Sequence, residues 1–273
     1  MSGALKKSKQ ALGRSLSHVG ITKTNLLIAR LRKQFWHAAP RSVVSYAGYR
    51  IRITDGPSFY TQCKDEFIHK IYRFESTRTD PTIIDGGSNI GISILYFKHL
   101  YPNARILGFE PDPDIFGLLQ ENIAMNNLSN VAVVNAGLGA EDGTASFVAD
   151  HSAGGRVAAG DNSIEVTIRR LSDSIEGRVD FLKLNIEGEE LPVLSELEVS
   201  GKLSSVEQVV LEYHGWPDGE QRLGKILELF DRNGFRYLVH DFDNETGDAT
   251  KPPFSWHSQK IWYCLIYAKN MSE

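Results

Sequence analysis

A glycine-rich turn follows the first apolar strand in the main part of the chain. Residues 83–91 read IIDGGSNIG, which contains the pattern D-x-G-x-x-x-G. Glycines between a strand and a helix let the backbone approach a ligand at the carboxyl edge of a sheet. A dinucleotide fold requires G-x-G-x-x-G, but counted from Gly86 the third position is Ser88. The spacing therefore departs from the dinucleotide pattern, and taken alone a glycine-rich turn is a weak signal for any one ligand.

An acidic residue ends the second apolar strand. Glu110 lies 19 positions after Gly91 and is followed by Pro111. A carboxylate in this place is positioned to accept hydrogen bonds from both ribose hydroxyls of a bound nucleoside. The alternative is a carboxylate near a helix N-terminus, and the glycine turn before it makes the ribose contact the favoured interpretation.

These residues need a sheet to position them, and the pattern after Pro81 supplies one. Short apolar strands alternate with helical patterns, which is typical of a doubly wound α/β sheet. An alternating stretch over 144–170, broken by a Gly-rich loop, predicts a hairpin between the third and fourth main strands. The predicted strands are 82–85, 105–110, 131–135, 181–185, 206–213, 236–239 and 261–267, and the predicted helices are 90–100, 115–126, 189–197 and 222–233.

The first 75 residues form a predicted N-terminal extension ahead of a domain over 76–273. We expect Thr24 to cap a helix that runs to Trp36. A hairpin over 43–46 and 49–53 and a lead-in helix over 61–74 follow.

Six segments in order resemble the FkbM family of S-adenosylmethionine-dependent methyltransferases. They are residues 84–91, FEPDP at 109–113, LQENIAMNNL at 119–128, LSD at 171–173, FLKLNIEGEE at 181–190 and LEYH at 211–214. The similarity covers about 82–214, half of the chain, and the ordered set is more specific than any single motif.

The resemblance implies a fold, a cofactor and an activity. The fold is the Rossmann-like class I methyltransferase sheet of seven strands, in the order 3-2-1-4-5-7-6, with the last strand antiparallel. The cofactor is S-adenosyl-L-methionine. The activity is methyl transfer, most often to an oxygen of a sugar, polyketide or related metabolite, so a sugar or glycoside is the expected acceptor.

The resemblance also implies the cofactor-binding residues. They are Asp85, Gly86, Gly87, Asn89 and Gly91 around the methionine part, Glu110 at the ribose, and Asn135, Ala136, Gly137 and Leu138 against the adenine. A purely structural turn is the alternative for each of these positions.

One position departs from the family. Asn185 stands where the family pattern K-x-D-x-E-G has Asp. An amide is no proton acceptor at neutral pH and is a poor ligand for a hard metal ion. We therefore expect no metal site, and the role of this position as a base is in doubt. Lys183 and Glu187 remain, and they could pair with one another, hold the strand end or face the substrate.

His214 is the candidate general base, because an alcohol acceptor must lose its proton. It ends the predicted fifth strand, on the ligand side of the sheet, and a histidine ordinarily titrates in the useful range. The alternative is a surface or core histidine without a catalytic role. His151 and His257 are weaker candidates.

Composition excludes several classes of protein. The chain has 273 residues, of which 41% are hydrophobic, so a core can form and wholesale disorder is excluded. Its two cysteines cannot build a disulfide framework or a zinc site, and no apolar run reaches the roughly 18 residues of a membrane span. The basic start lacks the apolar region of a signal peptide. We expect a reduced, cytoplasmic chain.

Basic charge is concentrated at the N-terminus. Residues 1–54 carry eleven Lys or Arg and no Asp or Glu, whereas the rest carries 19 basic and 34 acidic residues. Such a head predicts contact of residues 1–38 with an anionic membrane surface, peripheral to its inner face. A solvated terminus is the alternative.

Two other functions compete with methylation of a small metabolite. A nucleic-acid methyltransferase could use the basic head, but the body is acidic and no N-P-P-Y-type motif follows the fourth strand, so we expect no nucleic-acid partner. A catalytically weak cofactor-binding partner protein is the other, because of Asn185. The oligomeric state does not follow from the residues.

Overall fold

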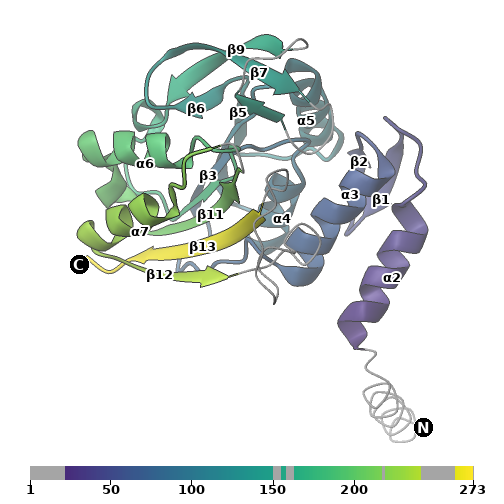
Figure 1. The fold of residues 1–273 in the computed structure, drawn as a ribbon. Coiled ribbons are helices and arrows are strands. Elements are labelled where there is room, and N and C mark those ends of the chain that lie inside the picture. The colour runs from purple at the N-terminus through teal and green to yellow at the C-terminus, as the bar shows by residue number, and fades with distance from the viewer. Residues whose placement is uncertain (1–21, 150–154, 158–162, 217–218, 241–261, 273) are drawn as a thin grey trace, which may run out of the picture.

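The computed structural model describes residues 22–149, 155–157, 163–216, 219–240 and 262–272. Its centre is a seven-stranded sheet with the order β12-β13-β11-β10-β3-β4-β5 (Figure 1). The strands are β3 (Thr82–Gly86), β4 (Arg105–Phe109), β5 (Val131–Val134), β10 (Phe181–Leu184), β11 (Gln208–Gly215), β12 (Phe235–His240) and β13 (Trp262–Asn270). Numbered by their place in the chain, and read from β5, they follow 3-2-1-4-5-7-6. β13 is antiparallel to both of its neighbours. The predicted α/β fold class is confirmed.

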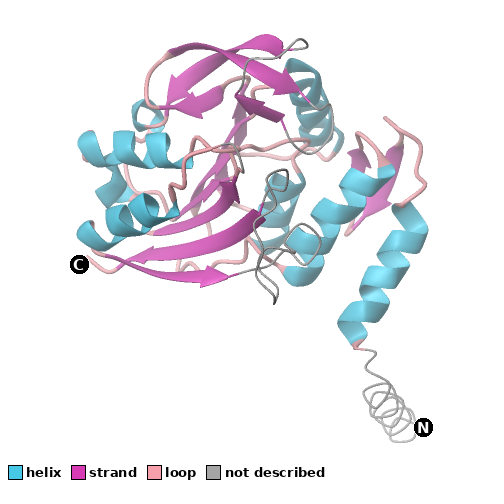
Figure 2. Cartoon of the chain, in the orientation of Figure 1, coloured by secondary structure: helices cyan, strands magenta, loops and turns pink. Residues whose placement is uncertain are grey.

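Helices cover both faces of this sheet (Figure 2). The helices are α4 (Ile92–Leu100), α5 (Pro113–Met125), α6 (Glu190–Val199) and α7 (Leu223–Arg232). Successive strand residues point to opposite faces. Ile84 therefore packs in a core with Leu194 of α6, whereas Ile83 packs in a second core with Phe97 of α4.

The segment between the third and fourth main strands forms a separate four-stranded sheet. Its order is β6-β9-β7-β8. The strands are β6 (Gly137–Gly139), β7 (Gly143–Ala149), β8 (Gly155–Val157) and β9 (Ser163–Arg170). The predicted hairpin is confirmed as the antiparallel pair β7–β9. The short strands β6 and β8 were not predicted, because three residues are too few to show an alternating pattern.

The N-terminal region begins with α2 (Lys23–Phe35) and the predicted hairpin, β1 (Val43–Tyr46) and β2 (Tyr49–Arg52). The expected cap at Thr24 is wrong. Thr22 has the extended backbone of a cap, and its Oγ1 accepts a hydrogen bond from the Asn25 N–H at 3.1 Å. None of the helices in the described ranges is long and apolar enough to cross a membrane.

The predicted lead-in helix over 61–74 is only partly found, because the helical residues end at His69. The chain instead forms α3 (Gly56–Cys63), followed by a π-helical turn over Lys64–His69. The Asp55 carboxylate caps α3 by accepting a hydrogen bond from the Ser58 N–H, and the turn ends at Lys70 in a left-handed conformation. These local signals override the apolar spacing that predicted a single helix.

Asn122 of α5 and Asn126, the C-cap residue of this helix, dock the hairpin onto the main domain. Asn122 accepts a hydrogen bond from the Arg52 N–H and donates to the Arg52 carbonyl, and Asn126 does the same with Arg50. The amide groups thus act as a neighbouring strand would. Residues on both sides of the predicted boundary share one buried core, but the division at residue 76 stays a prediction.

Candidate functional site

The turn after β3 is held by backbone contacts that only glycine permits. Gly87 has a φ of +80°, and a Cβ on it would lie 1.9 Å from the Asn185 carbonyl oxygen. The N–H groups of Gly87 and Ser88 both donate to the Phe109 carbonyl, at 3.0 and 2.8 Å. Gly91, with a φ of +90°, begins α4. The turn is therefore fixed between the ends of β4 and β10.

Glu110 is oriented toward this turn by two backbone groups. Its Oε2 accepts a hydrogen bond from the Asn89 N–H at 2.8 Å, and its Oε1 accepts one from the Asp112 N–H at 3.0 Å. Burial raises the pKa of Glu110 to about 7, although both hydrogen bonds oppose this shift. Each oxygen keeps acceptor capacity for a further partner. The helix cap of α5 is Asp112, not Glu110.

Lys183 supports the turn from beneath. Its Nζ lies 3.0 Å from Asp85 Oδ1 and donates to the Gly87 carbonyl at 2.6 Å. Both side chains are almost fully buried, and Ser93 also donates to Asp85. Lys183 thus pairs with Asp85, and the alternative in which it pairs with Glu187 is not found.

A buried polar cluster surrounds Lys183, and no local pattern in the sequence predicts it. Glu66, in the π-helical turn, lies near Lys183, and burial raises its pKa well above the usual range. Tyr72 places its ring under the Lys183 ammonium at 5.4 Å and donates a hydrogen bond to Glu212. Gln62 of α3 donates to Asn89 Oδ1 at 3.1 Å. The extension therefore contributes directly to the environment of the turn.

The loop after β10 has an unusual backbone. Glu187 has a φ of +57° and Gly188 a φ of +111°. A non-glycine residue in the left-handed region costs energy and is found more often at functional sites. Asn185, just before it, buries its Oδ1 without a hydrogen-bond partner within the described residues. The loop thus turns the Glu187 carboxylate back toward β11.

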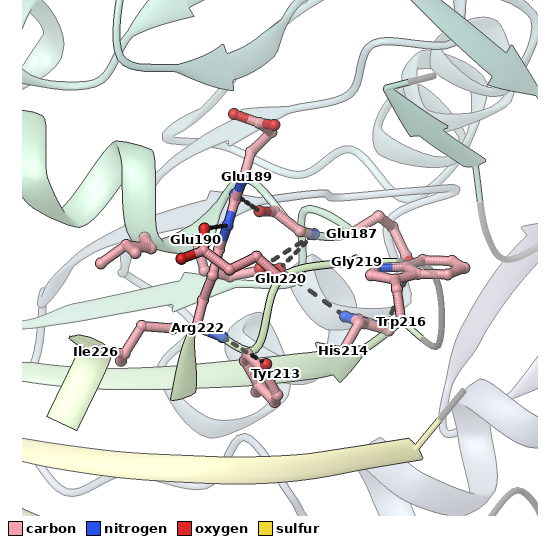
Figure 3. A pocket seen from close by; sticks show the side chains of 12 residues that line it. Glu187, Glu189, Glu190, Tyr213, His214, Trp216, Gly219, Glu220, Arg222 and Ile226 are labelled. Atoms are coloured by element: carbon pink, nitrogen blue, oxygen red, sulfur yellow. Dashed lines mark hydrogen bonds and ion pairs between the residues drawn. The ribbon is translucent and has the colours of Figure 1, made fainter. Parts of the chain in front are cut away.

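His214 meets that carboxylate. Its Nε2 lies 3.3 Å from Glu187 Oε2, and its Nδ1 lies 3.9 Å from Glu190 Oε1 (Figure 3). The expectation that His214 titrates near neutral pH is wrong, because burial lowers its pKa to about 4. At pH 7 the imidazole is therefore neutral, which is the form that accepts a proton. His214 and Glu187 were separate candidates in the sequence, and the structure places them side by side.

A cavity of about 220 Å³ opens beside this pair. Burial raises the pKa of Glu190 in its wall to about 7, and it also raises the pKa of Glu189. Figure 3 shows Trp216 beside His214, and their ring centroids are 6.1 Å apart. The lining residues are Glu187, Gly188, Glu189, Glu190, Leu191, Tyr213, His214, Trp216, Gly219, Glu220, Arg222 and Ile226.

A family model, described as the methyltransferase FkbM domain, matches residues 85–237 of the chain, more than half of its length. The chain belongs to the FkbM methyltransferase family. This family uses S-adenosylmethionine, so the protein is an S-adenosylmethionine-dependent methyltransferase. The resemblance seen in the sequence is confirmed.

Two curated proteins and one solved structure illustrate the relationship. Methyltransferase 1 of Beauveria bassiana is 31% identical over 187 residues, 55% of this chain and 75% of the relative. Hexuronic acid methyltransferase AglP of Haloferax volcanii is 29% identical over 150 residues, 53% of this chain and 60% of the relative. The crystal structure of an FkbM methyltransferase from Methylobacillus flagellatus aligns with a TM-score of 0.47 and 16% identity, over 79% of this chain and 56% of that one.

The residues of the glycine turn fit the methyltransferase cofactor. The Asn185 carbonyl oxygen fills the place that a Cβ on Gly87 would take, so the glycine lets the turn pack closely against the end of β10. Glu110 presents a buried carboxylate with acceptor capacity left. Within the described ranges, no three His, Cys, Asp or Glu side chains are placed to hold a metal ion.

The residues expected at the adenine lie next to Glu110. Asn135 donates hydrogen bonds to the carbonyls of Glu110 and Pro111, at 2.9 and 3.0 Å. Ala136 and Leu138 are buried, and Gly137 begins β6. Their contact with adenine stays a prediction. His151 and His257 lie outside the described residues, as do residues 1–21.

Proposed function

We propose that this methyltransferase methylates a hydroxyl oxygen of a small polar acceptor, a sugar or glycoside. The observation that supports this most is the pair of His214 and Glu187 at the mouth of the cavity. The pair lies at the carboxyl ends of β10 and β11, where open α/β sheets bind their ligands. A neutral imidazole beside a carboxylate is suited to deprotonate an alcohol.

Each part of the site then has one task. The turn with Gly87 and Gly91 would bind the cofactor together with Glu110, and the bound cofactor supplies an activated methyl group. The cavity would hold the acceptor and exclude water. Alignment of the acceptor in this cavity would provide much of the rate, because holding both reactants in place makes a bimolecular step effectively unimolecular.

His214 would accept the proton that the acceptor hydroxyl loses. Its Nε2 faces the Glu187 carboxylate, so a proton on Nε2 leaves the lone pair on Nδ1. Nδ1 is buried and has no hydrogen-bond partner among the described residues, so the acceptor hydroxyl would have to enter beside Glu190 to reach it. Glu187 would hold the ring and stabilise the imidazolium that forms, as a carboxylate does beside a catalytic histidine. Asn185 cannot take this role, because its amide is not basic.

A saccharide acceptor fits the chemistry of the cavity wall. Carboxylates accept hydrogen bonds from hydroxyl groups, and the indole of Trp216 offers a flat apolar surface to a sugar ring. A relative from Haloferax volcanii is named as a hexuronic acid methyltransferase, which supports the same class of acceptor.

The test is to incubate the protein with methyl-labelled S-adenosylmethionine and a panel of glycosides, and to locate the methyl group in each product by mass spectrometry and NMR. We expect ether products with the label on oxygen. Label on nitrogen or carbon, or in nucleic acid, would contradict the proposal. Cofactor binding without any transfer would favour the partner-protein alternative.

We also propose that α2 contacts an anionic membrane surface. Its exposed face carries Lys23, Arg30 and Lys33 beside Leu26 and Leu27, which are 37% and 51% exposed. Basic and apolar groups on one helix face suit a lipid interface. Binding to vesicles containing phosphatidylserine should fall with salt and with the variant Leu26→Ser/Leu27→Ser. Equal binding to uncharged vesicles would contradict this proposal.

A further inference from the structure

Among the described residues, the cavity wall carries more acidic than basic side chains. Four of these lining residues are glutamates and one is an arginine, and the histidine among them is neutral at pH 7. Lys183 does not contribute, because its ammonium is bound to Asp85 below the glycine turn. This imbalance is the feature that the proposed function leaves unexplained.

The arginine among the described lining residues is already engaged. Arg222 places its Nε 3.7 Å from Glu220 Oε2, and its Nη1 donates to the Gly188 carbonyl at 3.2 Å. Lys225 lies 2.5 Å from the same glutamate, at Oε1. Glu220 is therefore compensated from both sides. Arg222 also acts on Glu189, but burial outweighs it, so the pKa of Glu189 stays raised.

Glu190 is the lining carboxylate whose surroundings show the excess of acidic groups most clearly. Its carboxylate accepts hydrogen bonds from the N–H groups of Ile186 and Gly188. Among the described residues, the ion-pair partner recorded for it is His214, which is neutral. The residue is 2% exposed, and its pKa is raised to about 7. A buried carboxylate without a cation is costly unless a ligand brings the cation.

Trp216 adds a second group that favours a cation. Its ring lies nearly parallel to the His214 ring, with an interplanar angle of 21°, at the rim of the cavity. The face of an indole attracts ammonium groups electrostatically. Gly188 has no side chain, and a Cβ on it would lie 3.5 Å from Trp216 Nε1, so the loop approaches the indole closely.

We propose that the hydroxylated acceptor also carries a protonated amine, as an amino sugar does, and that Glu189, Glu190 and Trp216 recognise this amine. The inference rests on the proposed function and names its class of substrate. The ammonium would supply a cation to Glu190, whose ion-pair partner among the described residues is the neutral His214. A protonated amine has no lone pair, so the neighbouring hydroxyl, and not the nitrogen, remains the methyl acceptor.

The direct test compares three matched probes by calorimetry, with the protein saturated with S-adenosylhomocysteine. The probes are methyl glucosaminide, methyl glucoside and methyl glucuronide, which carry an ammonium, a hydroxyl and a carboxylate. S-Adenosylhomocysteine lacks the sulfonium charge, so a preference cannot arise from the cofactor methyl group. We expect the glucosaminide to bind about tenfold more tightly than the glucoside and the glucuronide to bind most weakly. Because a nearby cation lowers the pKa of a carboxyl, binding at pH 7 should release protons.

A pair of variants assigns the preference to the cavity. Glu189→Gln should remove most of the preference for the glucosaminide. Glu228→Gln, which removes an exposed carboxylate of α7 outside the cavity, is the matched control and should keep it. Both variants should bind S-adenosylhomocysteine as the native protein does.

Each outcome separates the two proposals. Equal binding of glucosaminide and glucoside, tighter binding of the glucuronide, or no binding of any probe would overturn the amine proposal. Ether products from neutral glycosides would leave the proposed function standing in that case. A glucosaminide that binds tightly but is methylated on nitrogen would instead overturn the proposed function and leave the amine site intact.

Discussion

The glycine turn and the acceptor cavity lie at the same edge of the sheet but are built in different ways. The turn is fixed by the backbone: Gly87 donates to the Phe109 carbonyl and lies against the Asn185 carbonyl. The cavity is defined by side chains, and its properties come from the burial of His214 and Glu190. The conformation of the turn thus does not depend on a ligand, whereas the carboxylates that line the cavity carry charge that a ligand can compensate.

We therefore assign cofactor binding to the turn and the chemical step to the cavity. A turn whose shape is fixed by its backbone would bind the part of the cofactor that does not react. Buried titratable side chains, such as those that line the cavity, can transfer protons and discriminate between substrates of different charge. Changes in the turn should therefore alter affinity and stability, and changes in the cavity should alter turnover and pH dependence.

The largest effect on the turn is expected from Gly87→Ala. The new Cβ would meet the Asn185 carbonyl oxygen at 1.9 Å, and the residue would also keep a positive φ. We expect S-adenosylhomocysteine affinity to fall by more than about 100-fold, since the turn must move. Gly48→Ala is the control: its φ is +90°, and nothing lies within 4 Å of its Cβ position. It should cost about 1–2 kcal/mol of stability from the backbone alone and leave affinity unchanged.

A smaller effect is expected from Glu110→Ala. Loss of hydrogen bonds to a charged carboxylate should weaken S-adenosylhomocysteine binding by roughly 1.5–3 kcal/mol. Calorimetry measures this directly, and NAD should show no binding to the native protein. Glu141→Ala removes an exposed carboxylate and is the control. Unchanged affinity in the Glu110 variant would remove this residue from the cofactor site.

The smallest effect concerns the pH dependence of stability. Glu190 has a pKa of about 7 in the folded protein and about 4.5 when exposed, so the fold binds its proton more tightly. Its contribution is fully present below pH 4.5 and is lost as the pH rises through 7. Glu190→Gln should flatten this decline by at most about 1.4 kcal/mol per pH unit. Urea unfolding between pH 5 and 8 measures it, and an unchanged slope would contradict the buried carboxyl.

The two regions also differ in how far the sequence predicts them. The turn could be predicted because its signals are local, with glycines directly after one strand and Glu110 at the end of the next. The proximity of His214 to Glu187 follows from the neighbouring places of β10 and β11 in the sheet. The pKa of His214 could not be predicted, because its burial depends on residues from several elements.

Contacts of the extension were the hardest to predict. Glu66 and Tyr72 lie in a segment whose apolar spacing indicated one continuous helix, and the cap and end of α3 decided otherwise. Tyr72 meets Glu212 across 140 positions of the chain. Lys183 could be assigned to Asp85 only once strand register placed the two side by side on one face of the sheet.

The central claim is that His214 acts in the methyl-transfer step and that the glycine turn binds the cofactor. It is tested most directly by the His214→Ala variant, in which kcat at saturating S-adenosylmethionine and Kd for S-adenosylhomocysteine are measured on the same sample. We predict that kcat falls by roughly 10²–10⁴, as expected for loss of a general base, and that Kd stays within about twofold. Full activity, or a loss of affinity that matches the loss of turnover, would contradict the claim.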